Sequence, residues 1–199
     1  SVLSKALVSH ALPQSGAARF LAQAAIALAG SMALVLSAKT KVVLGPVDLS
    51  LQTMVVLLLA STLGMRLGLA TVLLYLAQGA MGYPVFQSTP EKGIGLAYMA
   101  GTTGGYLAGF VVMTAIVGFA ADRGWGRNAL KLFAVMVLAD AVMLAMGAGW
   151  LAVLIGSENA WQFGVAPFIV PDLIKAALAA CLVPAGWSVL NAINSIVRQ

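Results

Sequence analysis

Two oppositely charged residues, Asp172 and Lys175, stand three positions apart in the apolar stretch VAPFIVPDLIKAALAACLV at 165–183. Residues three apart share a helix face, so a carboxylate acceptor and an ammonium donor would point the same way. Two interpretations stay open from this stretch alone. The side chains either form a local ion pair that satisfies itself, or they line one pocket and bind a ligand.

Further residues that could contact a ligand stand in two short stretches. Gln52 and Thr53 occur together, and Thr103 and Tyr106 belong to the glycine-rich stretch GTTGGY at 101–106. Three glycines in six residues let a ligand or a neighbouring backbone approach closely, but this is not the strand–loop–helix setting of a nucleotide-binding loop. Tight helix packing is the alternative interpretation of these glycines.

The composition indicates the environment in which these residues work. Of 199 residues, 61% are hydrophobic and 9% are charged, whereas about a quarter of the residues of a soluble domain are charged. The chain is therefore expected to be an all-α integral membrane protein, with one membrane domain over 1–199. The net charge of +5 then belongs to short loops beside lipid, and no nucleic acid is expected as a partner.

Uncharged segments divide the chain into predicted membrane helices. About 20 apolar residues cross the ~30 Å hydrocarbon core, and Gly64, Arg66 and Gly68 permit a tight reversal between two neighbouring segments. We expect a bundle of six transmembrane helices at roughly 20–38, 49–65, 67–86, 96–121, 130–155 and 171–197.

The distribution of lysine and arginine predicts the orientation, because these residues accumulate in cytoplasmic loops. With both termini cytoplasmic, the outer loops are roughly 39–48, 87–92 and 156–170. Asp172 and Lys175 then lie at the outer, amino-terminal end of the last helix. There Pro171 suits the first helical position, and the helix dipole favours an anion. The inner side carries Lys5, Arg19, Arg66, Arg123, Arg127, Lys131 and Arg198, and the outer side carries Lys39, Lys41 and Lys92.

The sequence argues against catalysis and against an internal energy source. The single histidine, His10, and the single cysteine, Cys181, have no evident partners for nucleophilic chemistry, and no metal-binding or GxxxxGK[ST] motif occurs. Asp140 lies near the middle of the fifth segment without an evident basic partner in a neighbouring segment. A proton-coupled secondary transporter is the alternative in which Asp140 carries a proton. We prefer a buried, protonated or hydrogen-bonded aspartate.

Five motifs in order resemble one known family. They are SLQT at 50–53, GMRLG at 64–68, YLAQGAMGYPVF at 75–86, GTTGGYLAGF at 101–110 and PDLIK at 171–175. Together they resemble the BioY family, the biotin-specific substrate-binding components of energy-coupling factor transporters. This chain departs from the family pattern at two places. Ser50-Leu51 replaces the family's usual threonine before QT, and Thr102 stands where the family commonly has proline.

The resemblance implies a function and a set of site residues. It implies a multi-pass protein of a bacterial-type plasma membrane that captures biotin from outside. Its implied partners are a transmembrane coupling subunit and cytoplasmic ATP-binding-cassette ATPases, and no cofactor is implied. Asp172 would accept hydrogen bonds from the ureido N–H groups, and Lys175 would pair with the carboxylate. Gln52, Thr103 and Tyr106 would join the pocket, with Lys92 as an alternative partner for the carboxylate.

The first predicted helix carries a stripe of small residues. A face of this kind lets another helix approach closely, and in the resembling family it meets the coupling subunit. Packing within the chain is the alternative. The stripe consists of Ala22, Ala25, Ala29 and Ala33.

Overall fold

The computed structural model describes residues 5–13 and 15–197, with side chains as far as residue 192. Five of the helices in this part are long and apolar enough to cross a membrane. They are α1 (Gly16–Lys39), α2 (Gln52–Ala80), α4 (Gly104–Asp122), α5 (Ala129–Ile155) and α7 (Ile169–Val197). The shorter elements are η1 (Leu7–His10), β1 (Lys41–Val42), β2 (Leu49–Ser50), α3 (Gly95–Met99), η2 (Trp125–Arg127) and α6 (Ser157–Gly164). The expected class, an all-α membrane protein, is confirmed.

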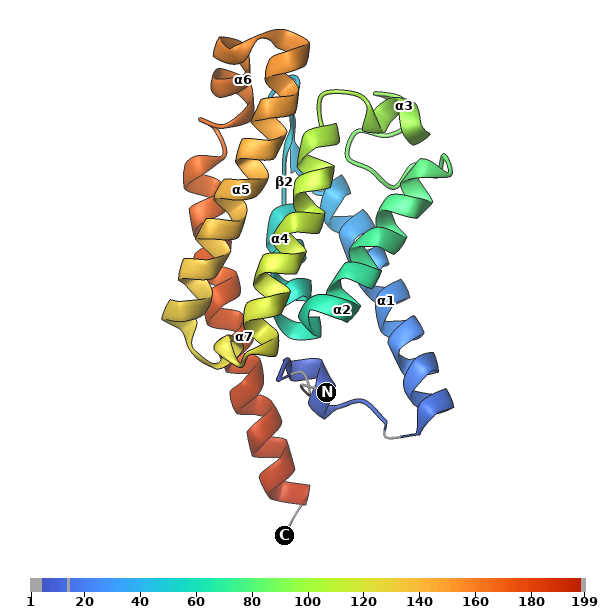
Figure 1. Cartoon of the computed structure of the whole chain (residues 1–199), viewed down its shortest axis with the longest axis vertical. Coiled ribbons are helices and arrows are strands. Elements are labelled where there is room, and N and C mark those ends of the chain that lie inside the picture. Colours follow the sequence, from blue (N-terminus) through green and yellow to red (C-terminus); the bar gives the residue numbers. More distant parts are fainter. Residues whose placement is uncertain (1–4, 14, 198–199) are drawn as a thin grey trace.

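Helix α2 reverses its direction at Gly64. In a straight helix, Gln52 and Tyr75 would lie ~34 Å apart, yet Gln52 Nε2 donates a hydrogen bond to the Tyr75 hydroxyl at 2.7 Å. Gly64 has φ 79° and ψ 178°, a conformation that glycine adopts far more readily than other residues. Figure 1 shows the two limbs running in opposite directions. The reversal lies where the GMRLG stretch predicts it.

The end of α4 holds this reversal in place. Asp122 Oδ2 accepts a hydrogen bond from the backbone N–H of Met65 at 3.1 Å, at the amino-terminal end of the second limb, where a carboxylate is favourable. Gly118 packs so closely that an added Cβ would lie 2.6 Å from Met65 Cα. The turn therefore depends on contacts with α4 as well as on Gly64 itself.

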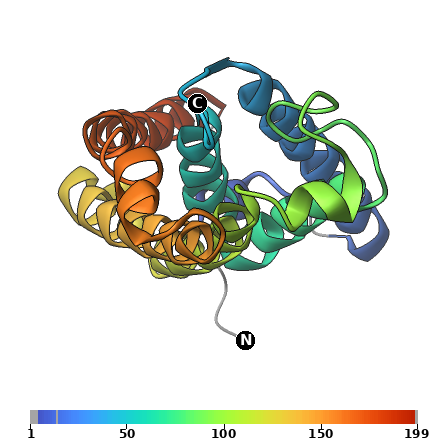
Figure 2. The same ribbon diagram turned by 90° about the horizontal axis from the view of Figure 1, so that it is seen from above.

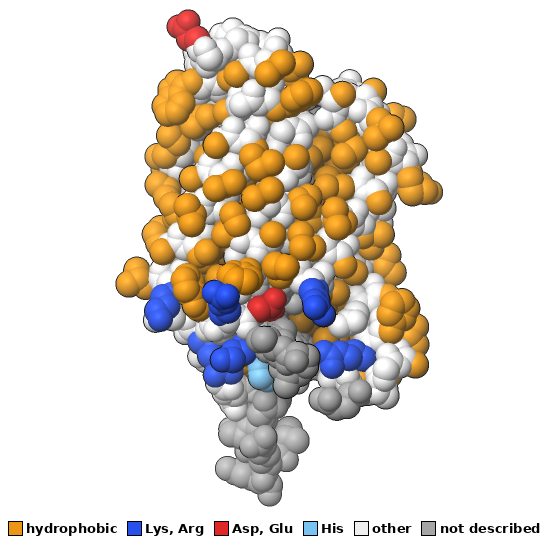
Figure 3. All heavy atoms as spheres, in the orientation of Figure 1, with side chains coloured by type: hydrophobic (Ala, Val, Ile, Leu, Met, Phe, Trp, Pro, Cys, Tyr) orange, Lys and Arg blue, Asp and Glu red, His pale blue; other side chains and the backbone are white. Residues whose placement is uncertain are grey.

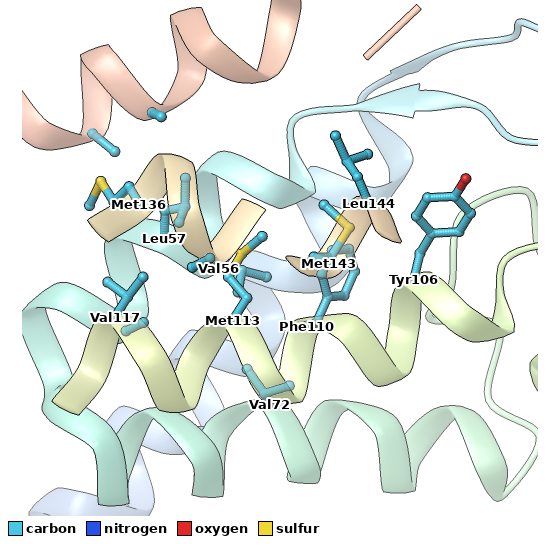
Figure 4. Packing of buried hydrophobic residues seen from close by; sticks show 14 of the residues in the cluster. Val56, Leu57, Val72, Tyr106, Phe110, Met113, Val117, Met136, Met143 and Leu144 are labelled. Carbon is cyan, nitrogen blue, oxygen red and sulfur yellow. The ribbon is translucent and has the colours of Figure 1, made fainter. Parts of the chain in front are cut away.

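Helix α4 lies at the centre of the core and packs between α2 and α5. Its buried residues Phe110, Met113 and Val117 meet side chains of both neighbours, as Figure 4 shows. Gly105 brings α4 close to α5, because an added Cβ would lie 2.7 Å from the Met146 carbonyl oxygen. The packing interpretation of the GTTGGY glycines therefore holds for Gly105.

Several helix bounds differ from those expected, while 20–38 and 130–155 fall within α1 and α5. The segment 67–86 stays helical only to Ala80, and 96–121 is broken into α3 and α4 by a turn at 100–103. Residues 49–50, expected in a helix, form β2. An apolar segment is not helical throughout when glycines and prolines interrupt it.

The carboxyl-terminal half differs in two further respects. α7 begins at Ile169 instead of 171, so Pro171 is the third helical residue and not the first. Helix α6 lies inside the predicted loop 156–170. Arg198, which the orientation argument used, lies outside the described residues.

The molecule has two chemically different ends. β2, α3 and α6 lie together at one end, and the described chain begins and finishes at the other (Figures 1 and 2). On the face drawn in Figure 3, a hydrophobic band is bordered by lysine and arginine at the end where the chain begins and finishes. The lysines Lys39, Lys41 and Lys92 belong to the opposite, loop-rich end, as the sequence predicts.

Candidate ligand-binding site

A cavity lies at the loop-rich end of the bundle, between α2, α4, α5 and the loops above them. Its empty volume is about 470 Å³, a figure that includes the open space at its mouth. The polar or aromatic residues lining it are Asp48, Ser50, Gln52, Thr53, Gln87, Tyr98, Thr103, Tyr106, Phe110 and Phe168, beside Val47, Leu107, Met143 and Leu144.

One wall of the cavity is aromatic. The rings of Tyr106 and Phe168 are stacked with their centroids 6.3 Å apart and an interplanar angle of 29°. The Tyr106 hydroxyl donates a hydrogen bond to the Gly164 carbonyl oxygen at 2.7 Å, which ties α4 to the end of α6. Tyr106 therefore lines the cavity with its ring, while its hydroxyl is already engaged in the fold.

Polar side chains also line the cavity. Gln52, Thr53 and Thr103 are buried here, and Gln52 uses its amide N–H to bond the Tyr75 hydroxyl. The structure thus places the predicted residues Gln52, Thr103 and Tyr106 around one cavity. Thr102, in the turn before α4, donates a hydrogen bond to the Pro46 carbonyl oxygen at 2.7 Å and so connects this turn to the loop that contains Pro46.

The roof of the cavity is held by an ionic cluster centred on Asp48, which we call the Asp48 cluster. Asp48 Oδ2 accepts from the Ser88 hydroxyl at 2.5 Å, and Asp48 lies 3.3 Å from Lys92 Nζ and 3.5 Å from Lys41 Nζ. Burial alone would raise the pKa of Asp48. The Ser88 hydrogen bond, with Lys92 and Lys41, outweighs burial and holds this pKa below its ordinary value.

The Asp48 cluster gives Lys92 a different contact from the one predicted. Lys92, predicted as an alternative partner for a ligand carboxylate, pairs with Asp48 and does not line the cavity. Asp48 does line the cavity, and the sequence reasoning missed it. The available signal was a single carboxylate in the 39–50 loop facing several lysines in the two outer loops.

Asp172 and Lys175 form a buried ion pair of 2.8 Å on α7. Their exposed fractions are 1% and 7%. The pair does not line the cavity. The Asp172 N–H donates a hydrogen bond to the Phe168 carbonyl oxygen at 2.8 Å, and Asp172 interacts electrostatically with Tyr106. Among the described side chains, Asp172 Oδ2 is buried without a hydrogen-bond partner. The ion pair thus leaves one strong acceptor unused.

Asp140 on α5 belongs to the same buried group. It interacts electrostatically with Asp172 and with Lys175. Among the described residues no lysine or arginine forms an ion pair with Asp140, which agrees with the expectation that it has no basic partner. Its Oδ1 atom is also buried without a hydrogen-bond partner in the described part of the chain. Sequence spacing could not reveal this neighbourhood, because it arises from the packing of α5 against α7.

The alanine stripe lies on a peripheral helix. α1 packs against α2 at the edge of the bundle. Ala25 and Ala29 are exposed, and Ala22 and Ala33 are half-buried. The stripe is therefore only partly used for packing within the chain.

Comparisons with known proteins agree on the family. The sequence matches the BioY family over residues 9–192. The chain belongs to the BioY family. A probable biotin transporter BioY of Pyrococcus horikoshii is 39% identical over 145 residues, which cover 73% of this chain and 83% of that protein. The biotin transporter BioY of Thermotoga maritima is 34% identical over 150 residues, which cover 75% of this chain and 86% of that protein.

A solved structure has the same fold as this BioY-family chain. It is a 2.1 Å crystal structure of the S-component for biotin from an ECF-type ABC transporter. The TM-score is 0.76 at 21% identity, covering 87% of this chain and 94% of the other. The family predicted from five motifs is confirmed, and the protein is a multi-pass membrane protein of a transporter family and not an enzyme.

Proposed function

We propose that this protein is the biotin-binding membrane component of an energy-coupling factor importer. The observation that carries the proposal is a cavity that joins an aromatic wall to polar groups, in a chain of the BioY family. In this role the protein captures biotin at the loop-rich end of the bundle and passes it inward with the help of partners.

The chemistry of biotin suits this cavity. Biotin has an apolar bicyclic body, a ureido group with two N–H donors and a carbonyl acceptor, and a carboxylate tail. The bicycle would rest on Tyr106 and Phe168, and Gln52, Thr53 and Thr103 line the same cavity. Small-molecule sites commonly combine such a wall with a few polar groups that fix orientation.

We assign the ion pair on α7 to the deep end of this site. Asp172 Oδ2 is an unused acceptor for a ureido N–H, and Lys175 would bind the carboxylate. Because the pair does not line the cavity in this structure, side chains at this end of the site must move for biotin to reach it.

We further propose six membrane segments with both termini in the cytoplasm of a bacterial-type cell. The reversal at Gly64 divides α2 into two limbs, which supports counting them separately. The basic residues at the end where the described chain begins and finishes support the orientation. The cavity then faces outward, as capture of an external vitamin requires.

Energy would come from partners, because the sequence contains no P-loop motif. We propose that the coupling subunit packs on the stripe formed by Ala22, Ala25, Ala29 and Ala33, and that ABC ATPases bind through it. Self-sufficient secondary transport is the alternative function, and the buried Asp140 is the observation in its favour.

Uptake by proteoliposomes separates the two functions. We expect no accumulation of radiolabelled biotin with this protein alone under an imposed proton gradient. Accumulation should appear when the coupling subunit and the ATPases are added, with ATP on the side of the membrane that carries the ATPases. Gradient-driven accumulation by the protein alone, abolished in Asp140→Asn, would establish the alternative instead.

A further inference from the structure

A second hollow lies on the membrane-spanning surface, far from the ligand cavity. It is lined by Ala115, Ile116, Phe119 and Arg123 of α4, Val135 of α5 and Trp125 of η2, with an empty volume of about 730 Å³ counting the open space. Phe119 and Trp125 are exposed. We call this hollow the α4–α5 groove. It begins near the middle of α4 and ends at the basic end of the bundle.

The mouth of the α4–α5 groove is positively charged. The Arg123 guanidinium lies 3.9 Å from the centre of the Phe119 ring. Arg66 follows Met65, which also lines the groove, and Lys131 lies one helical turn from Val135 on the same face of α5. In the described part of the chain, no carboxylate lies within ion-pair distance of Arg66, Arg123 or Lys131.

Asp122 is the acidic residue beside this mouth, and its single negative charge is fewer than the three positive charges of Arg66, Arg123 and Lys131. Asp122 directs Oδ2 to the Met65 backbone N–H, at the start of the second limb of α2. Its negative charge is thereby engaged with a helix terminus. The groove therefore combines an apolar channel in the membrane-spanning surface with cations at one end.

We propose that the α4–α5 groove binds an anionic phospholipid. One acyl chain lies along Ala115, Ile116 and Phe119, and the phosphate meets Arg123 at headgroup depth. Trp125 stands at the same level, where the amphipathic indole is favoured at a membrane interface. Basic pockets between membrane helices attract anionic headgroups through charge. A zwitterionic lipid offers the same chain without net charge, so the groove distinguishes the two lipids.

Native mass spectrometry of the purified full chain tests this binding. The probes are phosphatidylglycerol and phosphatidylcholine with identical acyl chains. We expect the wild type to retain one phosphatidylglycerol in preference to phosphatidylcholine. Arg123→Gln should weaken phosphatidylglycerol binding about fivefold, or about 1 kcal/mol. Arg19→Gln, an equal charge change on α1 at the same end, should leave it within about twofold.

Two further variants test the apolar part. Ala115→Trp fills the groove and should abolish retention of both lipids, whereas Phe119→Ala removes one wall without adding bulk and should also reduce retention. Circular dichroism identifies any variant that is unfolded. Equal retention of the two lipids, equal losses for Arg123→Gln and Arg19→Gln, or retention unchanged by both groove variants would each overturn the proposal. So would a protein partner found covering Phe119 and Trp125.

Discussion

Single residues at the ligand site have two different duties, binding and support. Asp172 is almost fully buried and keeps one oxygen unpaired, whereas Tyr106 has its hydroxyl engaged with Gly164. Removing the Asp172 carboxylate should weaken ligand contacts, and removing the Tyr106 hydroxyl should weaken the contact between α4 and α6. The assignments of Asp172, Lys175, Gln52, Thr103 and Tyr106 to biotin stay predictions that substitutions can separate.

Replacing either member of the α7 ion pair should weaken biotin binding. Asp172→Asn and Lys175→Ala each remove a charge-assisted contact and leave the other charge buried, so a loss of ~2–5 kcal/mol is expected by calorimetry. Biotin amide, which lacks the carboxylate, is the matched ligand. Lys175→Ala should lose much less affinity for the amide than for biotin, and equal losses would refute the pairing of Lys175 with the carboxylate.

The Asp48 cluster should contribute stability that depends on pH. Its folded pKa lies below the ordinary value of 3.8, so its stabilisation is fully present above that value and is lost as the pH falls through the folded pKa. The free energy of unfolding of Asp48→Asn should therefore be lower than that of the wild type at pH 7, by ~1.5–3 kcal/mol. The difference should vanish in acid. A difference independent of pH down to acid unfolding would remove Asp48 from this role.

At the scale of elements, the reversal of α2 rests on one residue with a positive φ. Gly64→Ala would place a side chain in a strained conformation and against the Asp122 carboxylate, so a loss of ~1–3 kcal/mol is expected. Gly149→Ala, in α5 with nothing within 4 Å of the added Cβ, is the control and should lose nothing. Chemical unfolding in detergent measures both, and a Gly64 variant as stable as the control would contradict the account.

Helix α1 should serve docking without serving ligand capture. Ala29→Trp would hold a partner helix away from the alanine stripe, and close packing between membrane helices depends on small residues. Biotin affinity should stay within about threefold, while co-purification with the coupling subunit and ATPases fails. Leu28→Trp, an exposed neighbour about 100° around the helix, should keep both. Normal co-purification of Ala29→Trp would return the stripe to packing within the chain.

For the whole molecule, features that are local in the sequence were predicted better than contacts between distant segments. The uncharged stretches located α1 and α5 closely, and GMRLG located the reversal, because burial in lipid and glycine conformation are local properties of sequence. The break between α3 and α4, helix α6 and the Asp48 cluster were missed. They depend on hydrogen bonds between distant loops, such as Thr102 to Pro46, which no periodicity records.

For the candidate site, too, the sequence predicted some features and missed others. Motif order identified the family and pointed to Gln52, Thr103 and Tyr106, which the fold brings around one cavity. It did not foresee that Asp172 and Lys175 lie outside the lining of this cavity, nor that Asp140 interacts electrostatically with the ion pair. Those relations come from the angle at which α5 and α7 pack, and side chains from different helices meet there without any signature in spacing.

The most direct test of the central claim is a calorimetric titration of biotin into the purified protein without partners. Because the cavity and the ion pair are complete within this chain, we expect saturable binding of one biotin per protein. Saturation should occur far below ~1 mM, where binding is worth only ~4 kcal/mol. A folded, monodisperse preparation that shows no saturable heat with biotin up to that concentration would contradict the account.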